Sequence, residues 1–174
     1  ISDSQQLVPE AKGTAHIGVF SFLPLKEIQS GLKFLIQADF LTAPGRGELA
    51  RDCKWNEWLA TCCFRTIAQK CISSFLKNEK WRFNYSSILT SDGAGHELFK
   101  RFLSDPIESY LKQNLLLVSE EGHLVSPNQA ILIKPTVRSL YDVADIAKLY
   151  PDKKVVHNDC AFPSLAEVSS LEED

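Results

Sequence analysis

A long amphipathic pattern between Trp55 and Leu76 constrains the fold of this chain more than any other feature. Apolar side chains recur there every three or four residues, which is the spacing of one helical face. We therefore predict one long helix, started by Asp52 or Asn56 as its cap, with the Trp55 indole in the core. The apolar positions are Trp55, Trp58, Leu59, Cys62, Cys63, Ile67, Ala68, Cys71, Ile72, Phe75 and Leu76.

Two β-prone runs precede this helix. The first lies between Ile17 and Pro24, and the second, over residues 32–41, alternates apolar and polar side chains. This alternation is typical of half-buried strands, so we expect two neighbouring strands. Residues 42–47 are rich in glycine and proline and form a loop between the second strand and the helix.

Smaller elements are expected after the long helix, and their mixed order indicates an α+β fold. We expect a mixed sheet with the long helix packed on it, followed by a smaller helix-hairpin-helix part. Pro106 either kinks the second helical pattern or starts a new helix. The expected elements are a helical pattern over 98–111, a hairpin of 115–118 with 123–125, a turn at Ser126-Pro127, a strand over 131–133, a helix over 137–150 and a strand over 154–157. The predicted organisation is a linker (1–14), an α/β domain (15–92) and a smaller α/β subdomain (93–174).

Charge and hydropathy exclude several classes of partner. The chain has 19 basic and 22 acidic residues, a net charge of −3, and its basic residues are scattered. We therefore expect no nucleic-acid partner. No run of eighteen apolar residues or signal peptide is present, so we expect no membrane contact and a cytoplasmic or nuclear location. The start at Ile1 and the absence of methionine suggest a piece of a larger protein.

The five cysteines favour reduced thiols over a disulfide framework. Their number is odd, and Cys62, Cys63 and Cys71 fall on the apolar face of the predicted helix, where we expect them to be free and largely buried. Zinc is the alternative, but His157 with Cys160 supplies only one ligand pair, so no metal site is predicted.

The sequence contains few motifs that would let this chain catalyse a reaction by itself. No serine lies in a G-x-S-x-G elbow, and the four histidines are dispersed. Asp92-Gly93-Ala94-Gly95 is similar to the Asp-x-Gly-x-Gly box of GHKL ATPases, but it is one residue short and follows no E-x-x-x-N helix. We interpret it as a loop between elements. A Walker loop is also missing, so we predict that this chain alone does not bind ATP.

Arg46 is the remaining candidate for chemistry. It lies between Gly45 and Gly47, after a predicted buried strand and before the long helix. A guanidinium group on such a pliable loop can reach an anion, and its fork matches phosphate oxygens. A solvated loop arginine is the alternative interpretation of the same residues.

Several of these segments together resemble a known family. The segments that carry the resemblance are Phe22-Leu23-Pro24, residues 31–41, Arg46 and Trp55-Asn56. They resemble the corresponding segments of large sacsin-like proteins that contain a histidine-kinase-like (GHKL) ATPase domain, including the plant NO VEIN group. The resemblance covers about residues 17–133. This sequence departs from the family pattern beside Arg46, because Gly45 stands in place of a serine and Gly47 in place of a glutamate.

The resemblance implies a non-autonomous, middle-type module of a chaperone-like ATPase. Such a segment is similar in position to the middle domain of the ninety-kilodalton heat-shock chaperone. It would dock on an upstream ATP-binding domain of the same chain, which would hold ATP and Mg²⁺, and Arg46 would be the catalytic, phosphate-directed residue. The whole protein would then be an ATPase, with unknown client or scaffold proteins as partners. The alternative is an interaction module of a degenerate member without ATPase activity, in which Trp58, Trp81 and the helices form the binding surface. An independent small enzyme is the third possibility.

Overall fold

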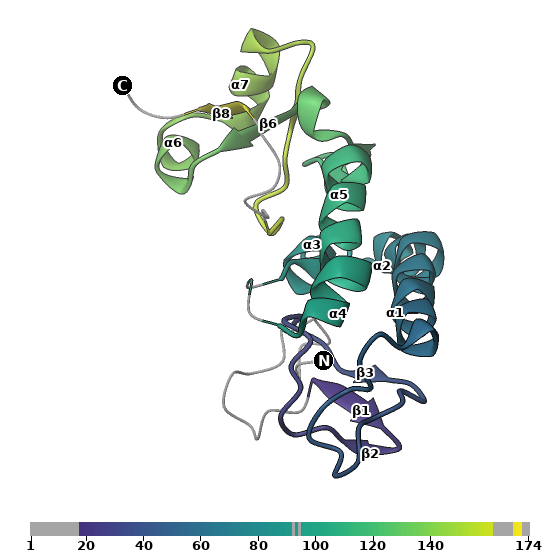
Figure 1. The fold of residues 1–174 in the computed structure, drawn as a ribbon. Coiled ribbons are helices and arrows are strands. Elements are labelled where there is room, and N and C mark those ends of the chain that lie inside the picture. Colours follow the sequence, from purple (N-terminus) through teal and green to yellow (C-terminus); the bar gives the residue numbers. More distant parts are fainter. Residues whose placement is uncertain (1–17, 92, 94, 162–168, 172–174) are drawn as a thin grey trace.

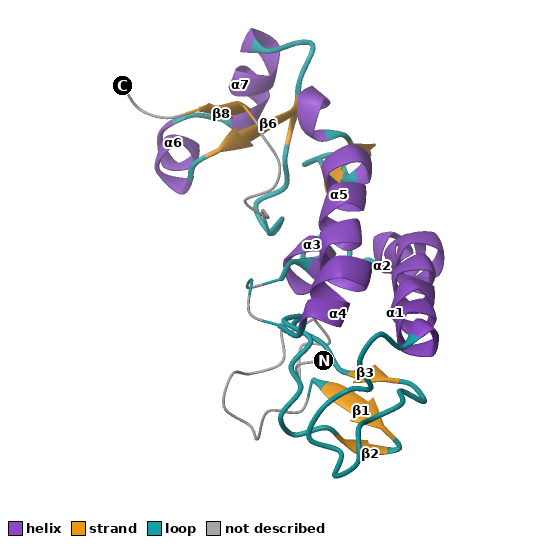
Figure 2. Ribbon diagram, viewed as in Figure 1, coloured by secondary structure: helices purple, strands orange, loops and turns teal. Residues whose placement is uncertain are grey.

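The computed structural model describes residues 18–91, 93, 95–161 and 169–171, and it confirms the α+β class. Figure 1 shows a small β-sheet at one end, a group of helices in the middle and a small unit of strands and helices at the other end. Figure 2 shows the same alternation coloured by secondary structure. The predicted linker over residues 1–14 lies outside the described residues.

The first sheet contains the two neighbouring strands that the sequence predicted. Strand β1 (Val19–Ser21) pairs in parallel with β3 (Ile36–Gln37) and antiparallel with β2 (Leu23–Pro24). The buried side chains of Val19 and Ile36 face each other across β1 and β3. Phe22 alone separates β1 from β2, and its positive φ of 58° reverses the chain there.

The long helix is confirmed, although it is not uniform. It comprises α1 (Lys54–Thr66), a π-helical turn η1 (Ile67–Cys71) and α2 (Ile72–Lys77). Neither predicted residue caps its start, because Cys53 occupies the N-cap position without a side-chain hydrogen bond. Asp52 has a left-handed backbone with φ of 48°, and Asn56 bonds to a neighbouring segment instead.

A second helical run lies beside the long helix and replaces the expected sheet as its main neighbour (Figure 1). It comprises α4 (Glu97–Phe99), a second π-helical turn η2 (Lys100–Ser104) and α5 (Asp105–Asn114). Pro106 lies in the first turn of α5, directly after η2, and the helical backbone at Ser104 and Asp105 keeps the run continuous there. The short helix α3 (Tyr85–Leu89) completes this helical layer.

The predicted hairpin and both predicted C-terminal strands are present. Strands β4 (Leu117–Val118) and β5 (Leu124–Val125) form an antiparallel hairpin, and the 3-10 turn η3 (Pro127–Gln129) follows. Strand β6 (Ala130–Ile133) then pairs in parallel with both β7 (Lys154–Val155) and β8 (Ser169–Leu171).

The helix predicted over 137–150 is two helices, α6 (Pro135–Leu140) and α7 (Val143–Leu149). Tyr141 has an extended backbone and ends the first helix. Asp142 then starts the second, because its carboxylate accepts a hydrogen bond from the Ala144 backbone N–H at 2.9 Å. The sequence pattern concealed this interruption, since the apolar spacing continues through it.

The hydrophobic core has two parts. The larger cluster joins the first sheet, both helical runs and the hairpin, and therefore extends across the predicted boundary at residue 92. The smaller one lies between β6, β7 and the helices α6 and α7, where it contains Ile131, Ile133, Val137, Ile146 and Val155. A single antiparallel bridge between Ser119 and Val156 connects the hairpin to β7. Among the described helices, none combines the length and the apolar character needed to cross a bilayer.

Candidate functional site

The Arg46 loop is a tight reversal of the chain between β3 and α1. An antiparallel bridge between Thr42 and Leu49 closes the loop, and the Ala43 N–H donates to Glu48 O at 2.9 Å. The Arg46 N–H donates to Ala43 O at 3.0 Å. Gly45 and Arg46 both have positive φ, at 92° and 61°. Arg46 therefore lies at the tip of an ordered turn, in a backbone conformation that most residues resist.

The Arg46 side chain is exposed and crosses to the first sheet. One guanidinium nitrogen donates to the carbonyl oxygen of Ser21 at 2.6 Å, next to the reversal at Phe22. No carboxylate in the described part of the chain pairs with Arg46, and Glu48 pairs with Arg51 at 3.5 Å instead. The guanidinium group thus retains donors and a net positive charge that could meet an external anion.

Trp55 and Asn56 tie the segment that enters this loop to the start of α1. The Asn56 side chain accepts from the Leu41 N–H and donates to the Leu41 carbonyl, both at 2.8 Å. The indole N–H of Trp55 donates to Asp39 O at 2.9 Å. The start of α1 is thereby fixed to the chain that enters the loop. A buried asparagine within an apolar helical pattern is the signal that could have revealed this role.

The expectation that Trp55 packs into the core is wrong. Its side chain is 46% exposed and stacks on Trp58, with the ring centroids 5.0 Å apart. An indole N–H requires a hydrogen-bond acceptor, and here the acceptor is a surface carbonyl rather than a core group. Trp81, the other tryptophan assigned to a binding surface, is half-buried and contacts Phe75 edge to face.

The glycine-rich loop after α3 is tied to the turn at residues 29–31. The Ser91 hydroxyl donates to Gly31 O at 2.9 Å, and the His96 N–H donates to Gln29 O at 2.8 Å. A Cβ atom on Gly95 would lie 2.7 Å from Ser30 O, so only glycine fits there. Asp92 and Ala94 of the same motif lie outside the described residues.

All five cysteines are free thiols, as predicted, but they are half-buried rather than largely buried. Cys63 and Cys71 pack against the edge of the core, whereas Cys62 does not belong to this group. Burial raises the pKa of the Cys63 thiol, and the neighbouring Cys62 adds to this rise. Within the described ranges, no group of three or more histidine, cysteine or acidic side chains could hold a metal ion.

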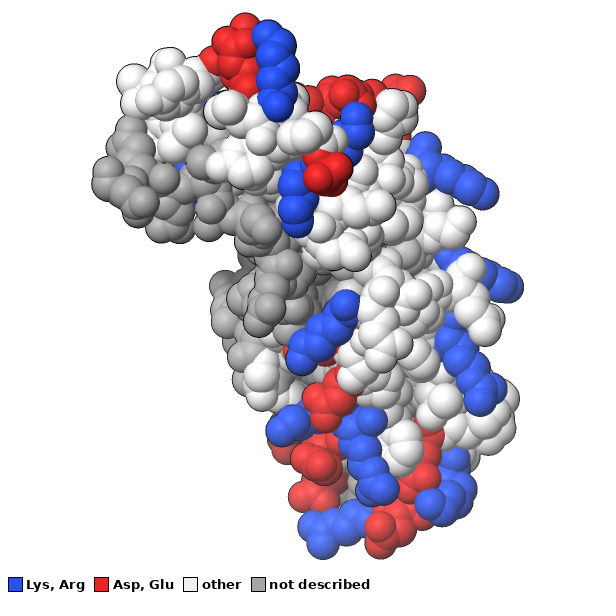
Figure 3. Space-filling view, turned by 90° about the horizontal axis from the view of Figure 1, so that it is seen from above, with Lys and Arg blue, Asp and Glu red and all other residues white. Residues whose placement is uncertain are grey.

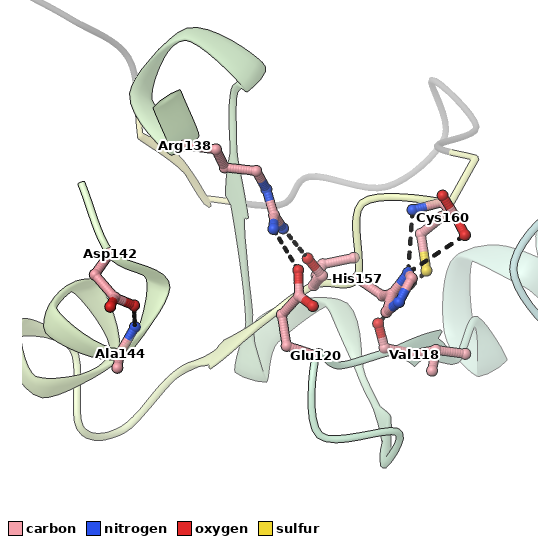
Figure 4. Close-up of polar contacts among 9 residues, drawn as sticks. Val118, Glu120, Arg138, Asp142, Ala144, His157 and Cys160 are labelled. Atoms are coloured by element: carbon pink, nitrogen blue, oxygen red, sulfur yellow. Dashed lines mark hydrogen bonds and ion pairs between the residues drawn. The ribbon is translucent and has the colours of Figure 1, made fainter. Parts of the chain in front are cut away.

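A polar cluster that the sequence did not predict joins the hairpin to the C-terminal unit. Arg138 of α6 forms an ion pair with Glu120 and donates to Val156 O, across the connection between β4 and β7 (Figure 4). The His157 ring contacts the Phe83 ring in a tilted arrangement with centroids 4.6 Å apart, and the Cys160 thiol donates to Val118 O at 3.5 Å. Burial is the main cause that raises the pKa of Cys160. These contacts hold the two units together.

A cavity of about 450 Å³ opens between this hairpin, α7 and β7. Its acidic groups already have partners. Glu120 pairs with Arg138, Asp142 caps α7, and Glu121 pairs with Lys154 at 3.0 Å, which lowers the pKa of Glu121. Acidic and basic side chains are also interspersed on the face seen in Figure 3. The Arg46 loop, whose guanidinium has no carboxylate partner among the described residues, is therefore the stronger candidate site.

Comparison with known proteins gives one informative match. The chain is 31% identical over 110 residues to Protein NO VEIN of Arabidopsis thaliana. The match shows a NO VEIN-like relationship. It covers 60% of this chain but 4% of the length of that protein, so this chain corresponds to a small part of its relative. No family model and no solved structure matches the chain.

Proposed function

We propose that this chain is a non-autonomous module of a large NO VEIN-like protein, and that it docks on a GHKL-type ATP-binding domain of the same protein. The observation that carries the proposal is the exposed Arg46 guanidinium, which has no carboxylate partner within the described residues and stands on an ordered turn. The NO VEIN-like match supports the origin in a much longer protein. The resemblance of the surrounding motifs supports the ATP-binding partner.

In this proposal Arg46 contacts the terminal phosphate of ATP that the other domain holds with Mg²⁺. Bound ATP supplies the phosphoryl group, and in the transition state of its transfer negative charge is spread over its three outer oxygens. A positioned guanidinium stabilises this charge with two parallel hydrogen bonds. The anchoring of the loop by Asn56 and Trp55 supports such a role, because positioning reduces the freedom lost when Arg46 engages phosphate.

The test compares Arg46 variants in the full-length protein. Arg46→Ala should lower the ATP turnover number roughly ten- to a thousandfold, about 1.4–4 kcal/mol, while the Kd for ATP changes little. Arg46→Lys should restore part of the activity, because an ammonium group lacks the planar fork. Arg51→Ala is the matched control, since Arg51 is exposed nearby and already pairs with Glu48. Unchanged turnover in Arg46→Ala would exclude the catalytic role.

The alternative function is an interaction module in a protein without ATPase activity. The stacked and half-exposed Trp55 and Trp58 favour it, because tryptophan often dominates the energetics of protein interfaces. Full-length protein that hydrolyses no ATP, together with loss of partner capture in Trp58→Ala, would favour this alternative. Retained capture in Trp58→Ala would argue against it.

A further inference from the structure

Phe22 is an unusual residue beside the candidate site. Its side chain is 86% exposed, the highest value among the large exposed apolar residues of the described chain, and its φ is 58°. A left-handed backbone is costly for a bulky side chain, and glycine or asparagine normally fills such a position. The exposed ring gains little burial in return, so the stability of this unit gives no reason for phenylalanine here.

Phe22 and Arg46 belong to one local surface. The Arg46 guanidinium donates to the carbonyl oxygen of Ser21, the residue directly before Phe22. Both residues occupy the tips of tight turns, and both have positive φ. Leu23, directly after Phe22, is also half-exposed. Strained backbone positions that persist in a fold often mark contact or functional sites.

We infer that Phe22 and Arg46 form one docking surface for a protein region that carries an apolar socket beside an anionic group, elsewhere in the same large protein. The inference rests on the proposed function, which identifies that region as the ATP-binding domain. Phe22 enters the socket, and Arg46 meets the anion. Charge complementarity supports this partner, because Arg46 has no counter-charge among the described residues. The match, which covers 4% of the length of a much longer relative, supports a partner elsewhere in the same protein.

Photocrosslinking in the full-length protein tests the partner directly. Phe22→p-benzoylphenylalanine should crosslink, on irradiation with ATP and Mg²⁺, to residues of the ATP-binding domain of the same chain. The same replacement at Leu149 is the matched control, since Leu149 is 75% exposed and apolar but lies in α7 of the other unit. Leu149 should give no such crosslink. Crosslinks from position 22 to the nucleotide, to other proteins only or to nothing would overturn the inference.

Phe22→Gly tests the origin of the strain. In urea unfolding of the full-length protein, Phe22→Gly should raise the midpoint of the transition in which this unit unfolds. The reason is that glycine adopts positive φ without strain. The photocrosslink at Leu23→p-benzoylphenylalanine should fall at least fivefold in this background. Asp52→Gly is the control, because Asp52 also has positive φ but lies directly before the N-cap of α1, outside the turn that Thr42 and Leu49 close around Arg46; that crosslink should persist. A lower midpoint in Phe22→Gly would show that the ring stabilises its own unit, which would overturn the inference.

The two proposals can fail separately. A crosslink from position 22 to the ATP-binding domain, with unchanged turnover in Arg46→Ala, would preserve the docking surface and remove the catalytic role. Slower turnover in Arg46→Ala without that crosslink would preserve the catalytic role and overturn the docking role of Phe22.

Discussion

The side chain of Asn56 bonds to both backbone groups of Leu41, accepting from its N–H and donating to its carbonyl at 2.8 Å each. Asn56 is 1% exposed and lies in the first turn of α1. The bonds therefore act in an environment with almost no competing water. They fix the distance between the end of the first sheet and the start of the long helix, and the Arg46 loop spans that distance.

Replacing Asn56 should accordingly destabilise the fold. We expect Asn56→Ala to lower the free energy of unfolding by about 1–3 kcal/mol, because the Leu41 N–H loses its partner and the Leu41 carbonyl keeps only the Ala50 N–H. Urea denaturation measures this loss. Asn114→Ala is the matched control, since Asn114 is exposed and its amide donates to Tyr110 O of its own helix; it should cost less than about 0.5 kcal/mol. Equal losses in the two variants would contradict the anchoring role.

Trp55 should contribute less than a core aromatic residue. We expect Trp55→Ala to cost about 1–2 kcal/mol, because the half-exposed ring loses one hydrogen bond and its stacking on Trp58. Phe99→Ala should cost about 3–5 kcal/mol, since Phe99 is fully buried. Chemical denaturation of both variants gives the comparison. A larger loss in Trp55→Ala than in Phe99→Ala would restore the sequence-based expectation of a buried indole.

Gly95 should tolerate no larger residue. Gly95→Ala places a methyl group 2.7 Å from Ser30 O, so the backbone must shift, at a cost of about 1–3 kcal/mol. Gly47→Ala is the control, because its methyl group would meet the flexible end of Glu27 at 3.1 Å and that side chain can move. Thermal unfolding should separate the two variants. Similar melting temperatures would mean that the contact between Gly95 and Ser30 relaxes easily.

Tyr85 should make the free energy of unfolding decrease at alkaline pH. Its buried hydroxyl donates to Leu116 O at 2.9 Å, and burial raises the pKa of Tyr85 from 10.0 to about 12. The unfolded chain releases this proton near pH 10 and the folded chain only near pH 12. The stability it contributes is therefore fully present below pH 10 and lost as the pH rises toward 12, by on the order of 2–3 kcal/mol.

Comparison with Tyr85→Phe isolates this effect. The variant lacks the titrating hydroxyl, so its urea midpoint should fall less steeply between pH 10 and pH 12. It should also be less stable at pH 8 by about 1–3 kcal/mol, because the Leu116 backbone groups lose a buried partner. Parallel pH profiles for the two proteins would contradict the prediction.

Periodic patterns predicted the main elements of this fold and failed where a single polar contact decides the outcome. The long helix, the hairpin and the strands near 131 and 155 follow from apolar spacing. The break at Asp142 depends on one carboxylate, which caps α7 by accepting from the Ala144 N–H. The apolar pattern contains no sign of this break. The observed β3 is limited to Ile36–Gln37, and beyond it Asp39 and Leu41 bond to Trp55 and Asn56 of the helix.

The candidate site was predicted only in part. The glycines around Arg46 indicated a pliable loop, and the structure gives it an ordered turn with Arg46 itself at positive φ. The sequence could not indicate that Arg46 reaches Ser21, because residues 21 and 46 are brought together only by the pairing of distant strands. The division of the chain at residue 92 and the catalytic role of Arg46 stay predictions.

The bridge between Ser119 and Val156 also bears on the order in which this chain can finish folding during synthesis. The hairpin is complete once residue 125 has been made, but the outer edge of β4 stays open until residue 156 emerges and covers it. Strand β6 is fully paired later still, because β8, its second parallel neighbour, ends at Leu171. Open strand edges invite pairing with other chains. If synthesis pauses between residues 125 and 156, the nascent chain would therefore expose an unpaired strand edge, and that edge could pair with a strand of another chain.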